Sequence, residues 1–253
     1  MMKFRLTTLT ACLLTGLAGS QQVCAALALD RTRVIFPGGE KSVTVNIHNE
    51  NTALPYLAQS WLEDGKGNKI TSPLVVVPPL QRVEAGAASQ LQIKALPAAS
   101  GLPQDRESVF YFDLREIPPR SKEPNTLQLA LQTRIKLFYR PKSIQPTRAQ
   151  MATPWQDRLT LSRQGDGYVV NNPTPYYISL VSAGSKNADA ARAKNFHPVM
   201  IDPQGSASLG VSAASLGASP ALAYINDYGG TRVLTFHCQG GQCQVVGEEN
   251  FKN

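Results

Sequence analysis

The chain has 253 residues, of which 42% are hydrophobic and 17% charged, and its formal net charge is +7. The 18 prolines and 19 glycines predict many short elements, and two globular domains of about a hundred residues each fit this length best. Lysines and arginines are spread along the chain rather than gathered into runs, which argues against a nucleic-acid-binding protein.

The N-terminus has the pattern of a secretory signal peptide. Lys3 and Arg5 precede an apolar core, residues 6–18, and a small-residue cleavage site ends at Ala25. We expect cleavage after Ala25 and export, with the formal charge falling from +7 to +5 as Lys3 and Arg5 are lost. The apolar core is too short to span a bilayer, and no later stretch reaches the ~18 apolar residues that a span needs.

The first half of the mature chain has the pattern of an all-β domain. Runs of apolar residues, separated by turn residues, predict about seven strands and no long amphipathic helix. The predicted strands are residues 27–36, 43–47, 56–62, 74–77, 90–94, 109–114 and 126–138. This spacing is typical of an antiparallel sandwich of immunoglobulin type.

The last of these predicted strands, residues 126–138, is unusually long. In an extended strand one face carries five apolar side chains, which are Leu127, Leu129, Leu131, Ile135 and Leu137. At ~3.3 Å per residue it would run ~40 Å, so one sheet of a small domain is too short to cover it. Nothing in the sequence protects the leucines from pairing with another chain. We interpret the overhang as a place for a partner strand; the alternative is a strand that bends from one sheet to another.

A proline-containing segment after this strand predicts the hinge between two domains. We place the boundary after Ile144, which gives an N-terminal domain of residues 26–144 and a C-terminal domain of residues 145–253. The second domain has its own β pattern. Its predicted strands are residues 158–161, 168–170, 176–181, 199–201, 221–225, 233–237 and 244–246, with a loop at 205–219 that holds at most one weak strand.

Two sets of charges call for an explanation. Arg33 and Lys136 each lie within an apolar strand, and if both face a cleft between the domains they would bind a carboxylate. The alternative is that each points to solvent. Glu107, Arg140 and Asp227 lie beside strand ends and predict an ion network, or else three unrelated surface charges.

Cys238 and Cys243 are the cysteines that remain after the signal peptide is removed. Four residues separate them, and in an oxidising compartment such a pair at a turn favours a hairpin disulfide. A metal site would need more ligands than the neighbouring His237 can add, and redox catalysis would need two intervening residues. We therefore expect a disulfide and no metal.

Catalysis finds little support in the sequence. The three histidines, His48, His197 and His237, lie in no known catalytic motif, and no nucleophile with a matching base is recognisable. No glycine loop suited to phosphate follows a strand. We predict that the protein is not an enzyme and uses no cofactor and no ATP.

Motifs along nearly the whole mature chain resemble those of the periplasmic chaperones of chaperone/usher pili, especially the PapD-like members with a short connection before the long strand. The similar stretches are residues 29–33, 54–59, 78–79 with Arg82, 104–108, 115–120, 136–141, 172–177 and 224–230. Each motif is weak alone, but together and in this order they are specific.

The resemblance implies two immunoglobulin-like domains arranged as an L, with Arg33 and Lys136 in the cleft between them. In that family these positions anchor the C-terminal carboxylate of a pilin subunit, and the positions of Leu127, Leu129 and Leu131 supply the strand that an incomplete pilin lacks. Members of the family deliver pilins to an outer-membrane usher. The resemblance further implies an interdomain ion network of Glu107, Arg140 and Asp227 and a disulfide between Cys238 and Cys243.

We therefore predict a periplasmic pilin chaperone whose free form can cap its own strand in a dimer. The competing hypothesis is a structural or adhesive surface β-sandwich protein, itself part of a pilus. Such a subunit would carry a donor extension before its first strand, whereas here the first predicted strand begins within a few residues of Ala26.

Overall fold

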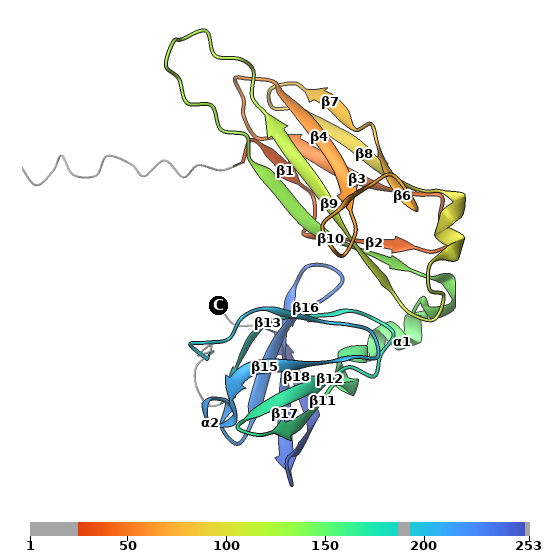
Figure 1. Ribbon diagram of the computed structural model, residues 1–253, viewed down its shortest axis with the longest axis vertical. Helices are drawn as coiled ribbons and strands as arrows, with labels where there is room; N and C mark the ends of the chain where they lie inside the picture. The colour runs from red at the N-terminus through yellow and green to blue at the C-terminus, as the bar shows by residue number, and fades with distance from the viewer. Residues whose placement is uncertain (1–24, 187–192, 251–253) are drawn as a thin grey trace, which may run out of the picture.

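The computed structural model describes residues 25–186 and 193–250, and these fold into two β domains that lie one above the other in Figure 1. The predicted all-β fold is therefore confirmed. The predicted signal peptide lies outside the described residues except for Ala25. Over the described part of the chain, no helix is long and apolar enough to cross a membrane.

Two sheets form the N-terminal domain. One has the strand order β1-β3-β8-β6; the other has the order β2-β10-β9-β4-β5, with β7 paired to β4. Apolar side chains from both sheets form a single core. The strands are β1 (Leu27–Leu29), β2 (Arg33–Pro37), β3 (Ser42–Asn49), β4 (Tyr56–Glu63), β5 (Lys69–Ile70), β6 (Leu74–Val77), β7 (Leu80–Val83), β8 (Ala88–Ala95), β9 (Ser108–Ile117) and β10 (Gln132–Arg140).

The single first strand predicted over residues 27–36 is wrong, because the chain changes sheets there. β1 pairs with β3 in an antiparallel manner, whereas β2 pairs with β10 in parallel in the opposite sheet. The crossing falls at residues 30–32, where the Asp30 carboxylate accepts hydrogen bonds from Arg31 and Asn46. Both halves bury apolar side chains in the same core, so the apolar pattern does not reveal the change of sheet.

The long strand predicted over residues 126–138 is also wrong in its first half. β10 begins only at Gln132, and residues 126–131 are irregular. From Gln132 onward the predicted alternation holds: Ile135 and Leu137 enter the core, while Lys136 faces away from it. The strand begins where pairing with β9 begins, at Gln132 opposite Arg115.

The C-terminal domain contains one hydrogen-bonded sheet of eight strands in the order β14-β13-β16-β17-β18-β11-β12-β15. Every strand contributes to a second core, so the sheet folds around it. The strands are β11 (Thr160–Gln164), β12 (Gly167–Asn171), β13 (Ile178–Ser185), β14 (Val199–Ile201), β15 (Ser206–Ser212), β16 (Pro220–Ile225), β17 (Thr231–Gln239) and β18 (Gln242–Asn250).

Helices are short in both domains. They are α1 (Arg148–Ala152), α2 (Ala213–Leu216) and the 3-10 turns η1 (Pro97–Gly101), η2 (Lys142–Ile144) and η3 (Trp155–Arg158). Three of them, η2, α1 and η3, form the connection between the domains, and Pro141 and Pro154 stand directly before η2 and η3. The predicted domain boundary after Ile144 lies between the two cores and stays a prediction.

β17 and β18 form a hairpin that the predicted disulfide closes. Cys238 and Cys243 are opposite each other in the strand register and are joined by a bond between their sulfur atoms. The Cys243 side chain lies in the second core.

We expect the double variant Cys238→Ser/Cys243→Ser to lower the free energy of unfolding of the C-terminal domain by about 2 kcal/mol. The reason is that a cross-link over so short a loop removes little entropy from the unfolded chain. Urea unfolding in a Trp61→Phe background would measure it, because the remaining tryptophan, Trp155, packs against the second core. A loss of 4 kcal/mol or more would show that the bond does more than close the loop.

Candidate functional site

Residues 126–131, which we name the leucine segment, project from the N-terminal domain without pairing in its sheets. Leu127 is 81% exposed and Leu129 is 58% exposed. The segment is tied to the domain near its end, where the N–H of Glu116 donates to the carbonyl of Leu131 over 3.0 Å. Two largely exposed leucines so close together are uncommon on a monomeric soluble domain and mark a contact surface.

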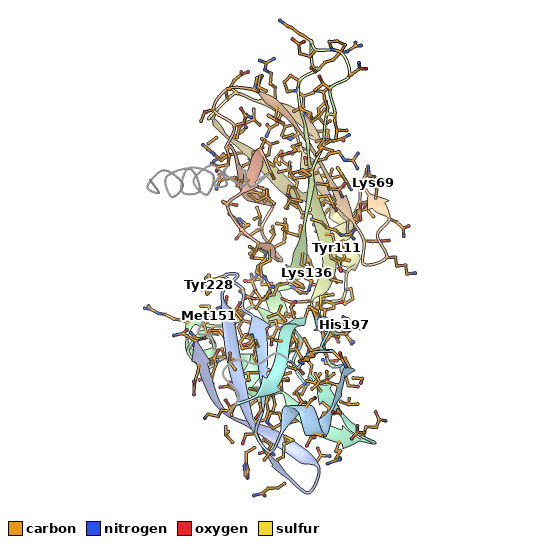
Figure 2. The ribbon with its side chains drawn as sticks, turned by 90° about the vertical axis from the view of Figure 1, so that its left-hand side faces the viewer. Lys69, Tyr111, Lys136, Met151, His197 and Tyr228 are labelled. Carbon is orange, nitrogen blue, oxygen red and sulfur yellow. A yellow bond between two sulfur atoms is a disulfide. The ribbon has the colours of Figure 1, made fainter. Side chains whose placement is uncertain are left out.

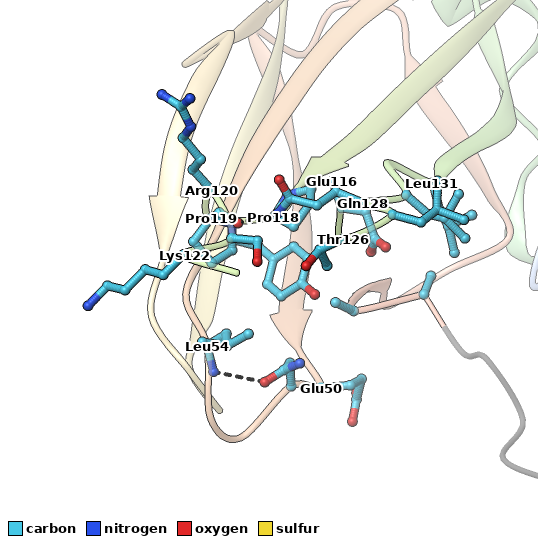
Figure 3. Close-up of a pocket in the computed structure, with 17 residues that line it drawn as sticks. Glu50, Leu54, Glu116, Pro118, Pro119, Arg120, Lys122, Thr126, Gln128 and Leu131 are labelled. Carbon is cyan, nitrogen blue, oxygen red and sulfur yellow. Dashed lines mark hydrogen bonds between the residues drawn. The ribbon is translucent and has the colours of Figure 1, made fainter. Parts of the chain in front are cut away.

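A pocket of about 820 Å³ lies between the leucine segment and the residues just before β1. Figure 3 shows its wall, with Glu50 and Leu54 on one side and Thr126, Gln128 and Leu131 on the other. Ala25, Ala26, Leu127 and Leu129 also line it. The leucines therefore border an open groove rather than a filled core.

β10 has an open edge beside this groove. On one side it pairs with β9 along most of its length, but on the other side β2 pairs only with Lys136–Arg140. Within the described part of the chain, no strand pairs with residues 132–135 on that side. Backbone N–H and C=O groups there are free to bond with an added strand.

Arg33 and Lys136 lie at the end of that open edge and are direct partners in the parallel register of β2 and β10. Lys136 Nζ donates to Ser179 Oγ over 2.9 Å, and Arg33 Nη1 donates to the carbonyl of Ile225 over 3.0 Å. Both acceptors belong to the C-terminal domain. The two cations therefore face the junction between the domains rather than open solvent.

Neither cation of this pair forms a salt bridge with any described residue, although Arg33 is buried and Lys136 is half-buried. Burial lowers the pKa of Lys136, and the neighbouring Arg33 guanidinium lowers it further. Burial likewise lowers the pKa of Arg33, an effect that the charges of Asp227 and Glu107 partly offset. The Nε of Arg33 is buried without a hydrogen-bond acceptor. Two adjacent cations with a free donor form an anion site that favours a carboxylate.

Glu107, Arg140 and Asp227 form a connected ion network across the domain junction. Arg140 Nε donates to Glu107 Oε1 over 2.8 Å, and its Nη atoms donate to both carboxylate oxygens of Asp227. Burial alone would lower the pKa of Arg140, but the hydrogen bonds to Asp227 and the charge of Glu107 raise it above its usual value. Burial raises the pKa of Glu107, and the charge of Arg140 offsets part of that rise.

Some residues at the junction were not predicted from the sequence. Ser179 and the carbonyl of Ile225 hold the basic pair, and the rings of Phe138 and Tyr177 lie 5.7 Å apart between the domains. Ser179 stands among apolar residues of β13 and is 3% exposed, so a polar side chain inside an apolar run was the available signal. The Ile225 carbonyl leaves no trace in the sequence because any residue supplies one.

No cluster of three or more histidine, cysteine, aspartate or glutamate residues suited to a metal occurs in the described ranges. The fold and the site together define a protein that binds polypeptide: an open strand edge, an exposed apolar row and an anion site lie in line.

Comparison with known proteins identifies the family. The family model of the pili and flagellar-assembly chaperone PapD N-terminal domain matches residues 26–145, and that of the pili assembly chaperone PapD C-terminal domain matches residues 154–236. The chain belongs to the PapD family of pilus-assembly chaperones. This class is non-enzymatic, so the prediction that the protein is not an enzyme is confirmed.

Individual relatives agree with this assignment. The probable fimbrial chaperone YfcS of Escherichia coli K12 is 47% identical over 248 residues, covering 98% of this chain and 96% of the relative. The chaperone protein PapD of Escherichia coli is 48% identical over 226 residues, covering 89% and 92%. A chain in the structure of Salmonella enterica SafA pilin in complex with the SafB chaperone is 26% identical, with a TM-score of 0.69 and coverage of 85% and 97%.

The predicted pilus-assembly function is therefore confirmed, and the alternative of a structural or adhesive surface protein is not favoured. Family membership also supports the predicted periplasmic location and a pilin as the partner.

Proposed function

We propose that the protein captures pilin subunits by donating its leucine segment and the open edge of β10 to the incomplete fold of the subunit. The observation that carries this proposal is the unpaired cationic pair, Arg33 and Lys136, at the end of an open strand edge. The C-terminal carboxylate of the pilin would bind the pair, and Leu127, Leu129 and Leu131 would fill the pilin groove. Each leucine that becomes fully buried contributes about 1.5 to 3 kcal/mol.

The remaining steps of the proposal follow from this binding mode. The signal peptide is cleaved after Ala25, the subunit is delivered to an outer-membrane usher, and no ATP or other cofactor is used. The ion network of Glu107, Arg140 and Asp227 fixes the angle between the domains, and so the place of the carboxylate site relative to the leucines. The chain falls in the subfamily with a short connection before the donor strand. Without a pilin, two copies cap each other's leucines.

Co-expression with a pilin subunit, followed by purification from the periplasm, tests the proposal. We expect a one-to-one complex that is stable in the absence of ATP. Recovery of the chaperone alone, with the pilin aggregated or degraded, would contradict it.

We expect the triple variant Leu127→Ser/Leu129→Ser/Leu131→Ser to lose pilin capture by at least about 100-fold, since the apolar contribution of three side chains is removed. Its own stability should change by less than about 1 kcal/mol, because Leu127 and Leu129 are exposed in the free protein. Val246→Ser, which alters an apolar residue that is 64% exposed in the C-terminal domain, is the matched control. Normal capture by the triple variant would rule out the leucine segment as the donor.

A further inference from the structure

The loop between β16 and β17 carries the most exposed large hydrophobic side chain among the described residues. Tyr228 is 90% exposed. Figure 1 shows this loop reaching from the C-terminal domain toward the N-terminal domain, and Figure 2 places Tyr228 and Lys136 at the level where the domains meet. A tyrosine exposed beside a binding site resembles the aromatic anchors of protein interfaces.

The backbone under this ring is firmly held. The side-chain oxygen of Asn226 accepts the N–H of Tyr228 over 3.0 Å and that of Gly230 over 2.9 Å. Asp227 is fixed by its two hydrogen bonds to Arg140. Since the loop is already ordered in the free protein, contacts to the ring cost little conformational entropy.

The loop also packs closely against Thr32, the residue directly before β2 and Arg33. A Cβ atom at Gly229 would lie 2.5 Å from the hydroxyl of Thr32, and the φ of Gly229 is +83°, so glycine is required for this close approach. Arg33, Asp227 and Tyr228 line one pocket of about 400 Å³. Arg33 and the exposed Tyr228 therefore border the same recess.

We propose that Tyr228 is a specificity-determining residue that packs against the apolar side chains of the last two residues of the bound polypeptide, while Arg33 holds its carboxylate. The proposal rests on the proposed function and adds a side-chain preference to it. Arg33 of the N-terminal domain binds the terminal carboxylate, and Tyr228 of the C-terminal domain contacts the side chains of the last two residues. The aromatic face rather than the hydroxyl makes this contact, because apolar side chains pack against a ring and accept no hydrogen bond from a hydroxyl.

Binding of synthetic peptides to the purified full-length protein tests this. Three ten-residue peptides share one alternating apolar and polar sequence: one ends in Leu-Leu with a free carboxylate, one ends in Ser-Ser with a free carboxylate, and one ends in Leu-Leu with an amide. We expect the wild-type protein to bind the Leu-Leu acid about tenfold more tightly than the Ser-Ser acid. Tyr228→Ala should bring that ratio close to one, and Tyr228→Phe should keep it.

The ratio of the affinities for the Leu-Leu acid and the Leu-Leu amide tests the carboxylate anchor independently of Tyr228. Tyr228→Ala should keep the preference for the acid, whereas Arg33→Ala should lose it. If Tyr228→Ala retains the wild-type preference for Leu-Leu, the assignment of Tyr228 is overturned while the anchor stands. If the wild-type protein binds acid and amide equally, the anchor itself fails, and this inference fails with it.

Discussion

We expect Arg33→Ala and Lys136→Ala each to abolish pilin capture without unfolding the chaperone. Removing one member of a buried, hydrogen-bonded charge contact weakens binding by about 2 to 5 kcal/mol, which is at least a 30-fold loss of affinity. Arg33 is buried and Lys136 is half-buried in the free protein, and neither forms a salt bridge with any described residue. The free energy of unfolding should therefore change by about 1 kcal/mol or less. Co-purification with the pilin measures capture, and urea unfolding measures stability.

The controls for this experiment are charges of the same type outside the junction. Lys66 is exposed in the turn after β4, and Arg82 is exposed and paired with Glu84. Lys66→Ala and Arg82→Ala should capture pilin as the wild-type protein does. Normal capture by both Arg33→Ala and Lys136→Ala would refute the carboxylate anchor.

We expect Arg140→Ala to destabilise the protein by about 3 to 5 kcal/mol, because it leaves the buried carboxylate of Glu107 without its cation. The side chain of Glu107 is 1% exposed, so water cannot replace the lost partner. The substitution also removes the two hydrogen bonds that join Arg140 to Asp227. Urea unfolding measures the loss, and small-angle scattering measures whether the angle between the domains becomes variable.

Arg134→Ala is the matched comparison because Arg134 lies on the same strand and forms a 2.7 Å salt bridge with Glu63 while its own side chain is 40% exposed. Glu63 is buried but keeps the hydrogen bond from Trp61 Nε1 when Arg134 is removed, so we expect this half-exposed pair to contribute about 1 kcal/mol. Equal losses for Arg140→Ala and Arg134→Ala would mean that the network does not hold the junction.

The strands could be predicted wherever apolar alternation coincides with burial inside this chain. β3 was expected from Val43, Val45 and Ile47, and β10 from Ile135 and Leu137. Apolar alternation gave a wrong prediction for the leucine segment, where it does not reflect burial inside this chain. The leucine segment alternates as a strand does, yet no strand in the described part of the chain pairs with it, and an unpaired strand is not stable in water.

The candidate site was predictable in its residue types but not in its arrangement. A lone charge within an apolar strand gave Arg33 and Lys136, but their adjacency depends on a parallel pairing between residues about a hundred positions apart. Such pairing is a property of the whole fold, and local periodicity carries no information about it. The change of sheet after β1, which makes this pairing possible, was missed for the same reason.

The core residues of β10 and Lys136 lie on opposite faces of the strand, so a bound subunit would contact both faces. Ile135 and Leu137 point into the first domain's interior, and the leucines at odd positions before them keep the same parity. If the leucine segment becomes extended on binding, its leucines lie in line with Ile135 and Leu137. The core of the bound subunit then continues the core of the N-terminal domain through two polypeptides. The C-terminus of the bound subunit would then lie on the opposite face of the sheet, where the two domains of this protein meet.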